Sequence, residues 1–349
     1  MGWRAAHHPL TRWPISALLI GLVLSGCAAA PTPSTTDLAK RLQSGLASGE
    51  AAFSAEFSST LTGASWYDVL HSGAASFRSA GGGALVVSTH FPGDRRTSTQ
   101  TITVTLADDG TISGVVDDGP RPLWAVDATD LTRATHGTVL SSGLDPGARR
   151  AWAARLDRAA VAVASAGILT STNTWDGGLV VEVPADAADF TAVTGSSADD
   201  TAAITSCTSG TPRIVVNPVS FAQGAEWLQA TLTHEAVHVA TDSPCHQGTG
   251  WVVEGAAESV AAMTDAATAK SDTALVRAYL RRHPLPTALP SEVTTPTDYA
   301  LAQVAVDAVR WKLDDRAASF IADGIDHGLS ADQTATATRL YLAALRRLR

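Results

Sequence analysis

Two histidines that flank a glutamate, His234, Glu235 and His238, are the residues of this sequence whose types and spacing most directly indicate chemistry. They lie in residues 224–241, GAEWLQATLTHEAVHVAT, which have no Pro, no Gly after the first position, and apolar residues at helical spacing. This pattern predicts a helix, on which imidazoles four residues apart project from one face and can bind a single cation. Zinc suits two imidazoles with an open position for water. Solvated surface histidines are the alternative interpretation.

Glu235 stands next to the first ligand position, from which its carboxylate can reach a metal-bound water without binding the metal itself. Further along, WVVEGAAE at residues 251–258 predicts a second helix with Glu254 and Glu258 on one face. A carboxylate at Glu254 would complete a His₂Glu catalytic zinc site. Glu258, one turn on, is placed to accept a hydrogen bond from a ligating imidazole and to fix its tautomer. For Glu258, an exposed acidic neighbour is the alternative.

HEAVH followed by WVVEGAAE resembles the gluzincin metallopeptidases, and in particular the peptidase-MA-like group, whose members share a HExxH helix and a later W-x-x-E-G-x-A segment. The likeness is dense from Glu226 to Val260. The metzincin pattern fails, because Thr241 stands where its Gly would be and Pro244 where its third His would be.

The resemblance implies that His234, His238 and Glu254 hold one zinc ion per chain, with Glu235 as general base and proton shuttle and Glu258 as the partner of an imidazole. It implies hydrolysis of a peptide or protein substrate without a covalent intermediate. A non-catalytic binding or scaffold protein of the cell envelope that retains a metallopeptidase-like fold is the alternative function.

Such a site also needs a hydrogen-bond donor for the oxyanion that forms at the scissile carbonyl. Tyr299, Tyr279 and His327 are candidates, and we favour Tyr299, on a helix predicted over residues 297–313. Each of the three is otherwise a structural residue. His246, just after Cys245, is interpreted as a loop residue, with a pocket residue as the alternative.

Cys207 and Cys245 bracket the motif helix and are expected to form a disulfide, which would stabilise the fold by roughly 3–5 kcal/mol. Two free buried thiols are the alternative. In gluzincins an exposed strand commonly pairs with extended substrate. Residues 213–217 are a candidate for that strand, with an ordinary sheet strand as the alternative.

The first residues indicate export. Arg4 and Arg12 precede a ten-residue apolar run, residues 15–24, that is too short to span a bilayer, and the run leads into Leu-Ser-Gly-Cys27. This tetrapeptide resembles the lipobox of bacterial lipoproteins. We therefore expect a signal peptide over residues 1–26, lipid on Cys27 that anchors the protein to the outer face of the cell membrane, and a tether over residues 27–36. An ordinary secretory signal is the alternative.

The elements that must position the site are expected in two domains of an α+β protein. Residues 37–143 are predicted to form a small α+β domain, with helices over residues 37–59 and 68–77 and a hairpin that turns at Asp109-Gly110. The element order resembles the cone-shaped fold of the nuclear transport factor 2 superfamily. Residues 144–349 are expected to form a mainly helical, zincin-like domain with a short sheet.

In that second domain, a helix is predicted over residues 148–166, strands over 179–183 and 213–216, and a polar loop over 196–206. A further helix is predicted over residues 261–280, followed by a proline-rich break and two or three more helices. The composition, 45% hydrophobic and 17% charged, is that of a folded protein. The net charge of −9 with scattered basic residues argues against a nucleic-acid partner. Scarce Lys beside abundant Ala indicates GC-rich coding, as in an actinobacterium.

Overall fold

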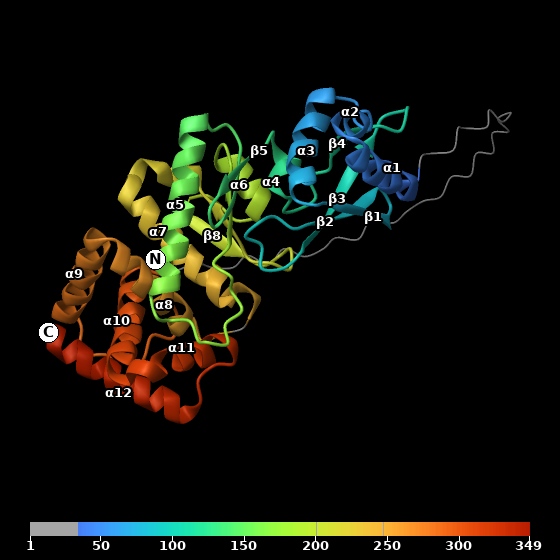
Figure 1. The fold of residues 1–349 in the computed structure, drawn as a ribbon. Coiled ribbons are helices and arrows are strands. Elements are labelled where there is room, and N and C mark those ends of the chain that lie inside the picture. Colours follow the sequence, from blue (N-terminus) through green and yellow to red (C-terminus); the bar gives the residue numbers. More distant parts are fainter. Residues whose placement is uncertain (1–33, 200, 247) are drawn as a thin grey trace, which may run out of the picture. The chain divides into compact units, whose positions relative to one another are not determined.

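The structure is a computed structural model that describes residues 34–199, 201–246 and 248–349. The signal peptide expected over residues 1–26 and the lipidated Cys27 lie outside these residues. The expected tether, residues 27–36, is described only from Ser34, and it ends earlier than expected: Ser34 caps helix α1 (Thr35–Ser48) by accepting a hydrogen bond from the Asp37 amide. The fold is α+β, as predicted, with a mostly helical C-terminal region (Figure 1).

The first part of the described chain is a four-stranded antiparallel sheet, β1-β2-β3-β4, with helices α1, α2 and α3. Their bounds are α2 (Glu50–Ser54), α3 (Thr60–Ser72), β1 (Ser76–Gly81), β2 (Ala84–Thr89), β3 (Ser98–Leu106) and β4 (Ile112–Val115). The predicted turn is confirmed between β3 and β4, where Gly110 has a φ of 80°. The helix predicted over residues 68–77 is wrong at its end: α3 stops at Ser72, Ala74 has a φ of 46°, and Phe77 lies in β1.

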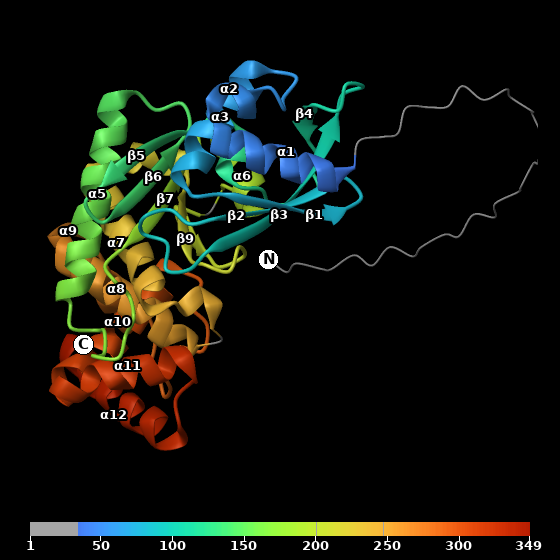
Figure 2. The same ribbon diagram turned by 45° about the vertical axis from the view of Figure 1, so that its right-hand side comes forward.

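A second sheet of five strands has the order β5-β6-β7-β9-β8, with β6, β7 and β9 parallel and the edge strands β5 and β8 antiparallel to their neighbours (Figure 2). Their bounds are β5 (Asp130–Ala134), β6 (Gly137–Ser141), β7 (Leu179–Val183), β8 (Ala203–Ser206) and β9 (Arg213–Val216). The predicted strands over residues 179–183 and 213–216 are confirmed. The loop predicted over residues 196–206 is wrong in its last part, because β8 forms there.

The central strands β6, β7 and β9 are buried on both faces, which explains why β7 is an uninterrupted run of apolar residues apart from Glu182. Val139 and Val181 belong to a core shared with α5 (Pro146–Ser165) and α7 (Ala225–Thr241). Leu140 and Val180, each adjacent in sequence to one of these residues and so on the opposite face, belong to the core of the first part of the chain, with Trp124. The sheet therefore takes strands from both sides of residue 143, where a domain boundary is expected from the sequence, and joins both cores.

A buried ion pair also links the two parts. Arg213 of β9 contacts Asp94, from the segment after β2, at 2.7 Å, and Glu182 of β7 at 3.6 Å. The side chains of Arg213 and Asp94 are 5% and 0% exposed. Burial lowers the pKa of Arg213, but the interactions with Asp94 and Glu182 outweigh it and raise that pKa. Arg213 therefore stays charged inside the protein.

The remaining helices follow the predicted order with two corrections to their bounds. They are α4 (Leu123–Val126), α6 (Ala187–Thr194), α8 (Gly250–Thr264), α9 (Ala266–Arg282), α10 (Pro296–Leu313), α11 (Ala317–Asp326) and α12 (Ala331–Leu348), with 3-10 turns η1 (Pro218–Gln223), η2 (Ser243–Cys245) and η3 (Asp314–Arg316). The helix predicted over residues 261–280 is divided between α8 and α9, because Asp265 ends α8 and caps the start of α9. The helix predicted over 148–166 starts earlier, at Pro146, after the cap Asp145.

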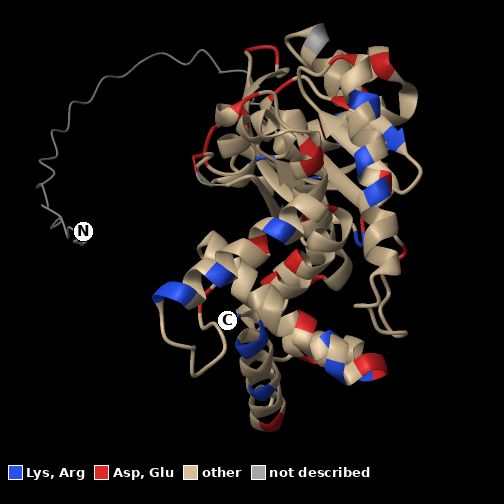
Figure 3. Cartoon of the chain, turned by 90° about the vertical axis from the view of Figure 1, so that its left-hand side faces the viewer, with Lys and Arg blue, Asp and Glu red and all other residues tan. Residues whose placement is uncertain are grey.

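Charged side chains are spread over the molecule. Figure 3 shows Lys and Arg on several helices rather than on one face. Within the described residues, no helix has the length and apolar character that crossing a bilayer requires. The absence of a nucleic-acid partner and the cone-shaped fold of the first part of the chain stay predictions.

Candidate metal centre

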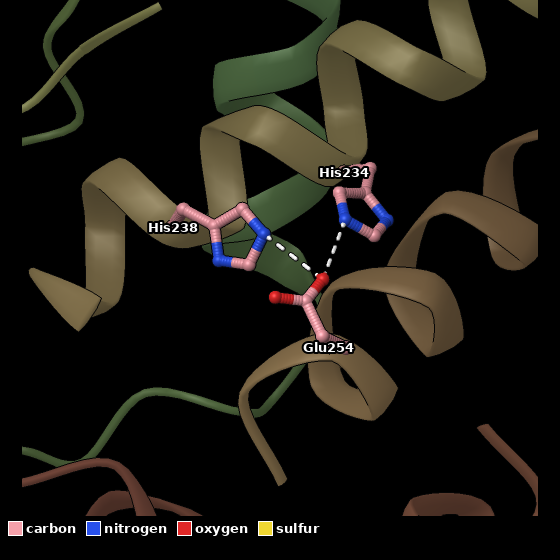
Figure 4. A group of neighbouring side chains, drawn as sticks. All are labelled: His234, His238 and Glu254. Carbon is pink, nitrogen blue, oxygen red and sulfur yellow. Dashed lines mark ion pairs between the residues drawn. The ribbon is translucent and has the colours of Figure 1, made fainter. Parts of the chain in front are cut away.

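His234 and His238 come from α7 and face Glu254 of the adjacent helix α8 (Figure 4). The Oε2 atom of Glu254 lies 3.3 Å from His234 Nε2 and 3.5 Å from His238 Nε2. The ligand atoms of the three residues lie within 4.8 Å of one another, which is close enough for all three to bind one ion. The structure thus brings together the three residues that the sequence predicts as metal ligands.

The other ring nitrogen of each histidine has its own partner. His234 Nδ1 lies 3.0 Å from Glu258 Oε2, and His238 Nδ1 lies 3.0 Å from Ser243 Oγ. An N–H on each Nδ1 leaves the lone pair of Nε2 directed at the point that Glu254 also faces. The donor set of two imidazole nitrogens and one carboxylate therefore fits a divalent metal ion. Glu258 lies where the sequence places it, whereas Ser243 is a partner that sequence reasoning missed.

The charges at this point are tightly coupled in the metal-free protein. Burial lowers the pKa of His234, but the contacts with Glu254 and Glu258 outweigh it and raise the pKa to about 10. Burial likewise raises the pKa of Glu254, but contacts with His234 and His238 outweigh it and lower that pKa well below its usual value. Without a metal ion, His234 therefore carries a positive charge beside the carboxylate of Glu254 at neutral pH.

Glu235 is 8% exposed. It is not one of the three residues whose ligand atoms lie close enough together to bind one ion. The hydroxyl of Thr205, on edge strand β8, donates a hydrogen bond to Glu235 Oε2 at 2.6 Å. Glu235 and Thr205 line a cavity of about 540 Å³ together with His234, His238 and Glu254. The carboxylate is therefore held in a fixed orientation beside the candidate metal position. Thr205 is a second partner that the sequence analysis missed, because it places residue 205 in a loop.

Tyr299 of α10 lines the same cavity, and its ring centroid lies 5.9 Å from that of His234. Burial, followed by the negative charges of Glu254 and Glu235, raises its pKa to about 12. The phenol therefore keeps its proton at neutral pH and can donate it in a hydrogen bond. Of the other candidates, Tyr279 stacks on His283 with 4.7 Å between ring centroids, and His327 lines a different cavity.

Cys207 and Cys245 form the predicted disulfide, with their Cα atoms 5.4 Å apart. Cys207 directly follows β8, and Cys245 lies in η2. The bond therefore connects the strand that carries Thr205 to the turn that carries Ser243. His246 follows η2 in a loop, and its exposed side chain lines the cavity, so it is also the pocket residue that the sequence analysis gives as the alternative.

Of the two interpretations of residues 213–217, the structure supports the ordinary sheet strand over the strand that pairs with substrate. β9, residues 213–216, has β7 on one side and β8 on the other, so its backbone groups already have partners. β8 is the edge strand, and Ala203, Ile204 and Thr205 line the cavity that holds the candidate metal position. The open strand at the site is therefore β8, from a segment that the sequence does not reveal as a strand.

Comparisons with models of known protein families, with curated proteins and with solved structures find no match for this chain. The resemblance to gluzincins therefore depends on the sequence motifs HEAVH and WVVEGAAE.

Proposed function

We propose that this protein is a zinc-dependent peptidase of the gluzincin type. The observation that carries the proposal is the convergence of His234 Nε2, His238 Nε2 and Glu254 Oε2, beside the hydrogen-bonded carboxylate of Glu235. Two imidazoles and a carboxylate with room for water are the donor set of catalytic zinc sites. The cavity of about 540 Å³ at this point leaves space for a substrate.

His234, His238 and Glu254 would hold the zinc ion. When bound, zinc acidifies water and polarises the scissile carbonyl. Glu235 would take a proton from the attacking water as the water oxygen bonds to the carbonyl carbon. It would then deliver that proton to the amine as the C–N bond breaks. Tyr299 is the candidate donor to the oxyanion. Glu258 and Ser243 would keep both imidazoles in the orientation that the metal requires.

Strand β8 is the part of the site that could bind the main chain of a peptide substrate. Within the described part of the chain β8 pairs with β9 alone, which leaves the backbone groups of its other edge for an extended chain. A peptide added to a sheet edge is held by main-chain hydrogen bonds, which are independent of sequence. Thr205 lies on this strand and contacts Glu235, so a peptide paired there would lie next to the general base.

The proposed location is the outer face of the cell membrane, with the lipid on Cys27 as the anchor. It depends on residues 1–27, which lie outside the described part of the chain. Metabolic labelling with a lipid precursor tests it: the wild-type protein should incorporate label, and Cys27→Ser should not. Labelling of both proteins would contradict the proposed anchor.

The function is tested by metal content and peptide cleavage in the same preparations. The wild type should hold one zinc per chain and cleave members of a peptide library read by mass spectrometry. His238→Ala should lose zinc and activity, whereas Glu235→Ala should keep zinc and lose activity by at least about 100-fold. Glu226→Ala, at the start of the same helix, is the control. Equal cleavage by Glu235→Ala and the wild type would exclude the mechanism, and zinc binding without any cleavage would favour a binding protein.

A further inference from the structure

A second cavity, of about 360 Å³, adjoins the candidate metal centre on the side of α9. His234, Glu235 and Tyr299 line both cavities, so the two meet at the proposed reaction centre. The second cavity alone is also lined by Glu258 of α8 and Asp272 of α9. A substrate held at the metal with its carbonyl beside Glu235 would therefore place a neighbouring group in this cavity.

The cavity holds carboxylates without a cation. Asp272 is 9% exposed, and its Oδ2 atom has no hydrogen-bond partner within the described chain. Among the described residues that line the cavity there is no Lys or Arg. Burial and the nearby Glu258 raise the pKa of Asp272 to about 7. Two acidic side chains packed together in a buried site cost free energy, and a cation placed beside Asp272 would recover part of that cost.

The charge balance points the same way when zinc is present. Glu235, Glu254 and Glu258 bring three formal negative charges to the two cavities, and Asp272, whose pKa is raised to about 7, adds part of a fourth at neutral pH. A divalent ion with neutral imidazoles offsets two of them. The remaining negative charge is concentrated at Glu258 and Asp272, away from the three ligand atoms.

Apart from its carboxylates, the cavity has a largely apolar part of its wall. Trp227 is 36% exposed and lines the cavity, along with Ala230, Ala261 and Pro296. An apolar wall that leads to a carboxylate complements a side chain with a methylene stem and a charged end. The face of an exposed indole also attracts a cation.

We propose that this cavity binds the side chain of a Lys or Arg residue next to the scissile bond of the substrate, and that Asp272 is the specificity-determining residue. This inference rests on the proposed peptidase function. A free α-amino group offers the same charge, but it has no methylene stem to cover the wall formed by Trp227. Peptides that carry the two kinds of cation distinguish the sources.

The experiment measures peptide binding without turnover, in the zinc-loaded Glu235→Ala protein. The probes are N-acetylated peptide amides that share one sequence and carry Lys, Arg or norleucine at a single position, scanned across the peptide. A norleucine peptide with a free amino terminus is the fourth probe. We expect the Lys and Arg peptides to bind at least about 30-fold more tightly than the acetylated norleucine peptide at one position. Adding Asp272→Asn should reduce that preference to about threefold or less, while adding Glu292→Gln, an exposed acid outside the cavity, should leave it intact.

Each other outcome overturns the inference. If no position shows a preference for Lys or Arg, the cavity does not bind cationic side chains. If only the free-amine peptide binds tightly, the cavity binds the substrate amino terminus instead. If Asp272→Asn weakens all peptides alike, Asp272 only holds Glu258 in place. Cleavage by the wild type is measured separately: activity without a Lys or Arg preference would refute this inference alone, whereas a binding preference without activity would refute the peptidase function alone.

Discussion

Replacing Thr205 by Val should reduce turnover without loss of metal. The substitution keeps the shape of the side chain but removes the hydroxyl that donates to Glu235 Oε2 at 2.6 Å. A hydrogen bond to a charged group contributes about 1.5–3 kcal/mol, and if this is lost from the transition state kcat falls about 10- to 150-fold. Thr205 is not one of the three candidate ligands, so zinc content should not change.

Thr205→Ser is the matched control, because serine retains the hydroxyl at the same position on β8. The assay measures zinc per chain, kcat and KM for the wild type and both variants on one peptide. A loss in kcat with Val, recovery with Ser, and equal zinc in all three proteins is the expected result. Equal kcat in wild type and Thr205→Val would show that this hydrogen bond does not position the base. Loss of zinc in Thr205→Val would show that the strand supports the ligands instead.

Ser243→Ala should weaken zinc binding about 10- to 100-fold in a chelator competition, because it removes the partner of His238 Nδ1; unchanged affinity would contradict this role. In the metal-free protein the pKa of His234 is raised from 6.5 to about 10, so its contribution to stability is complete below pH 6.5 and is lost as pH rises towards 10. With a chelator present, the free energy of unfolding measured in urea should therefore fall by up to about 1.4 kcal/mol per pH unit between pH 7 and pH 9. No such fall would be seen if this histidine titrated normally. Arg213→Met should lower the free energy of unfolding by about 3–5 kcal/mol, since it leaves two buried carboxylates without a cation. Arg41→Met, which removes an ion pair whose arginine is 39% exposed, should cost at most about 1 kcal/mol; similar losses in both would contradict the reasoning.

The sequence predicts best the parts of the site that lie on continuous helices. The helix expected over residues 224–241 is α7 to within one residue, because its periodic apolar residues are not interrupted by Gly or Pro. Helical geometry then places His234 and His238 on one face. β7 and β9 are equally clear, since each is a short run rich in Val that ends at or just before a proline.

What the sequence does not reveal depends on contacts between distant segments. Thr205 is found only once β8 pairs with β9, and β8 has just four residues with no strong alternation. Ser243 has no pattern that distinguishes it from other loop serines. Asp272 resembles any polar residue of an amphipathic helix until α9 packs beside α8. Turn-forming residues at 141–147 do mark a loop, between β6 and α5, but a local pattern cannot show that β6 and β7 are neighbours in one sheet.

That shared sheet decides how the protein can be cut and studied in pieces. A fragment that begins at residue 144 would lose β5 and β6, and the apolar strand β7 would become an open edge. Unpaired edges of this kind recruit other chains, so such a fragment should aggregate. It would also lack Asp94, whose carboxylate compensates the buried charge of Arg213. A protease that nicks the loop after β6 should consequently leave two pieces that stay associated until denaturant separates them.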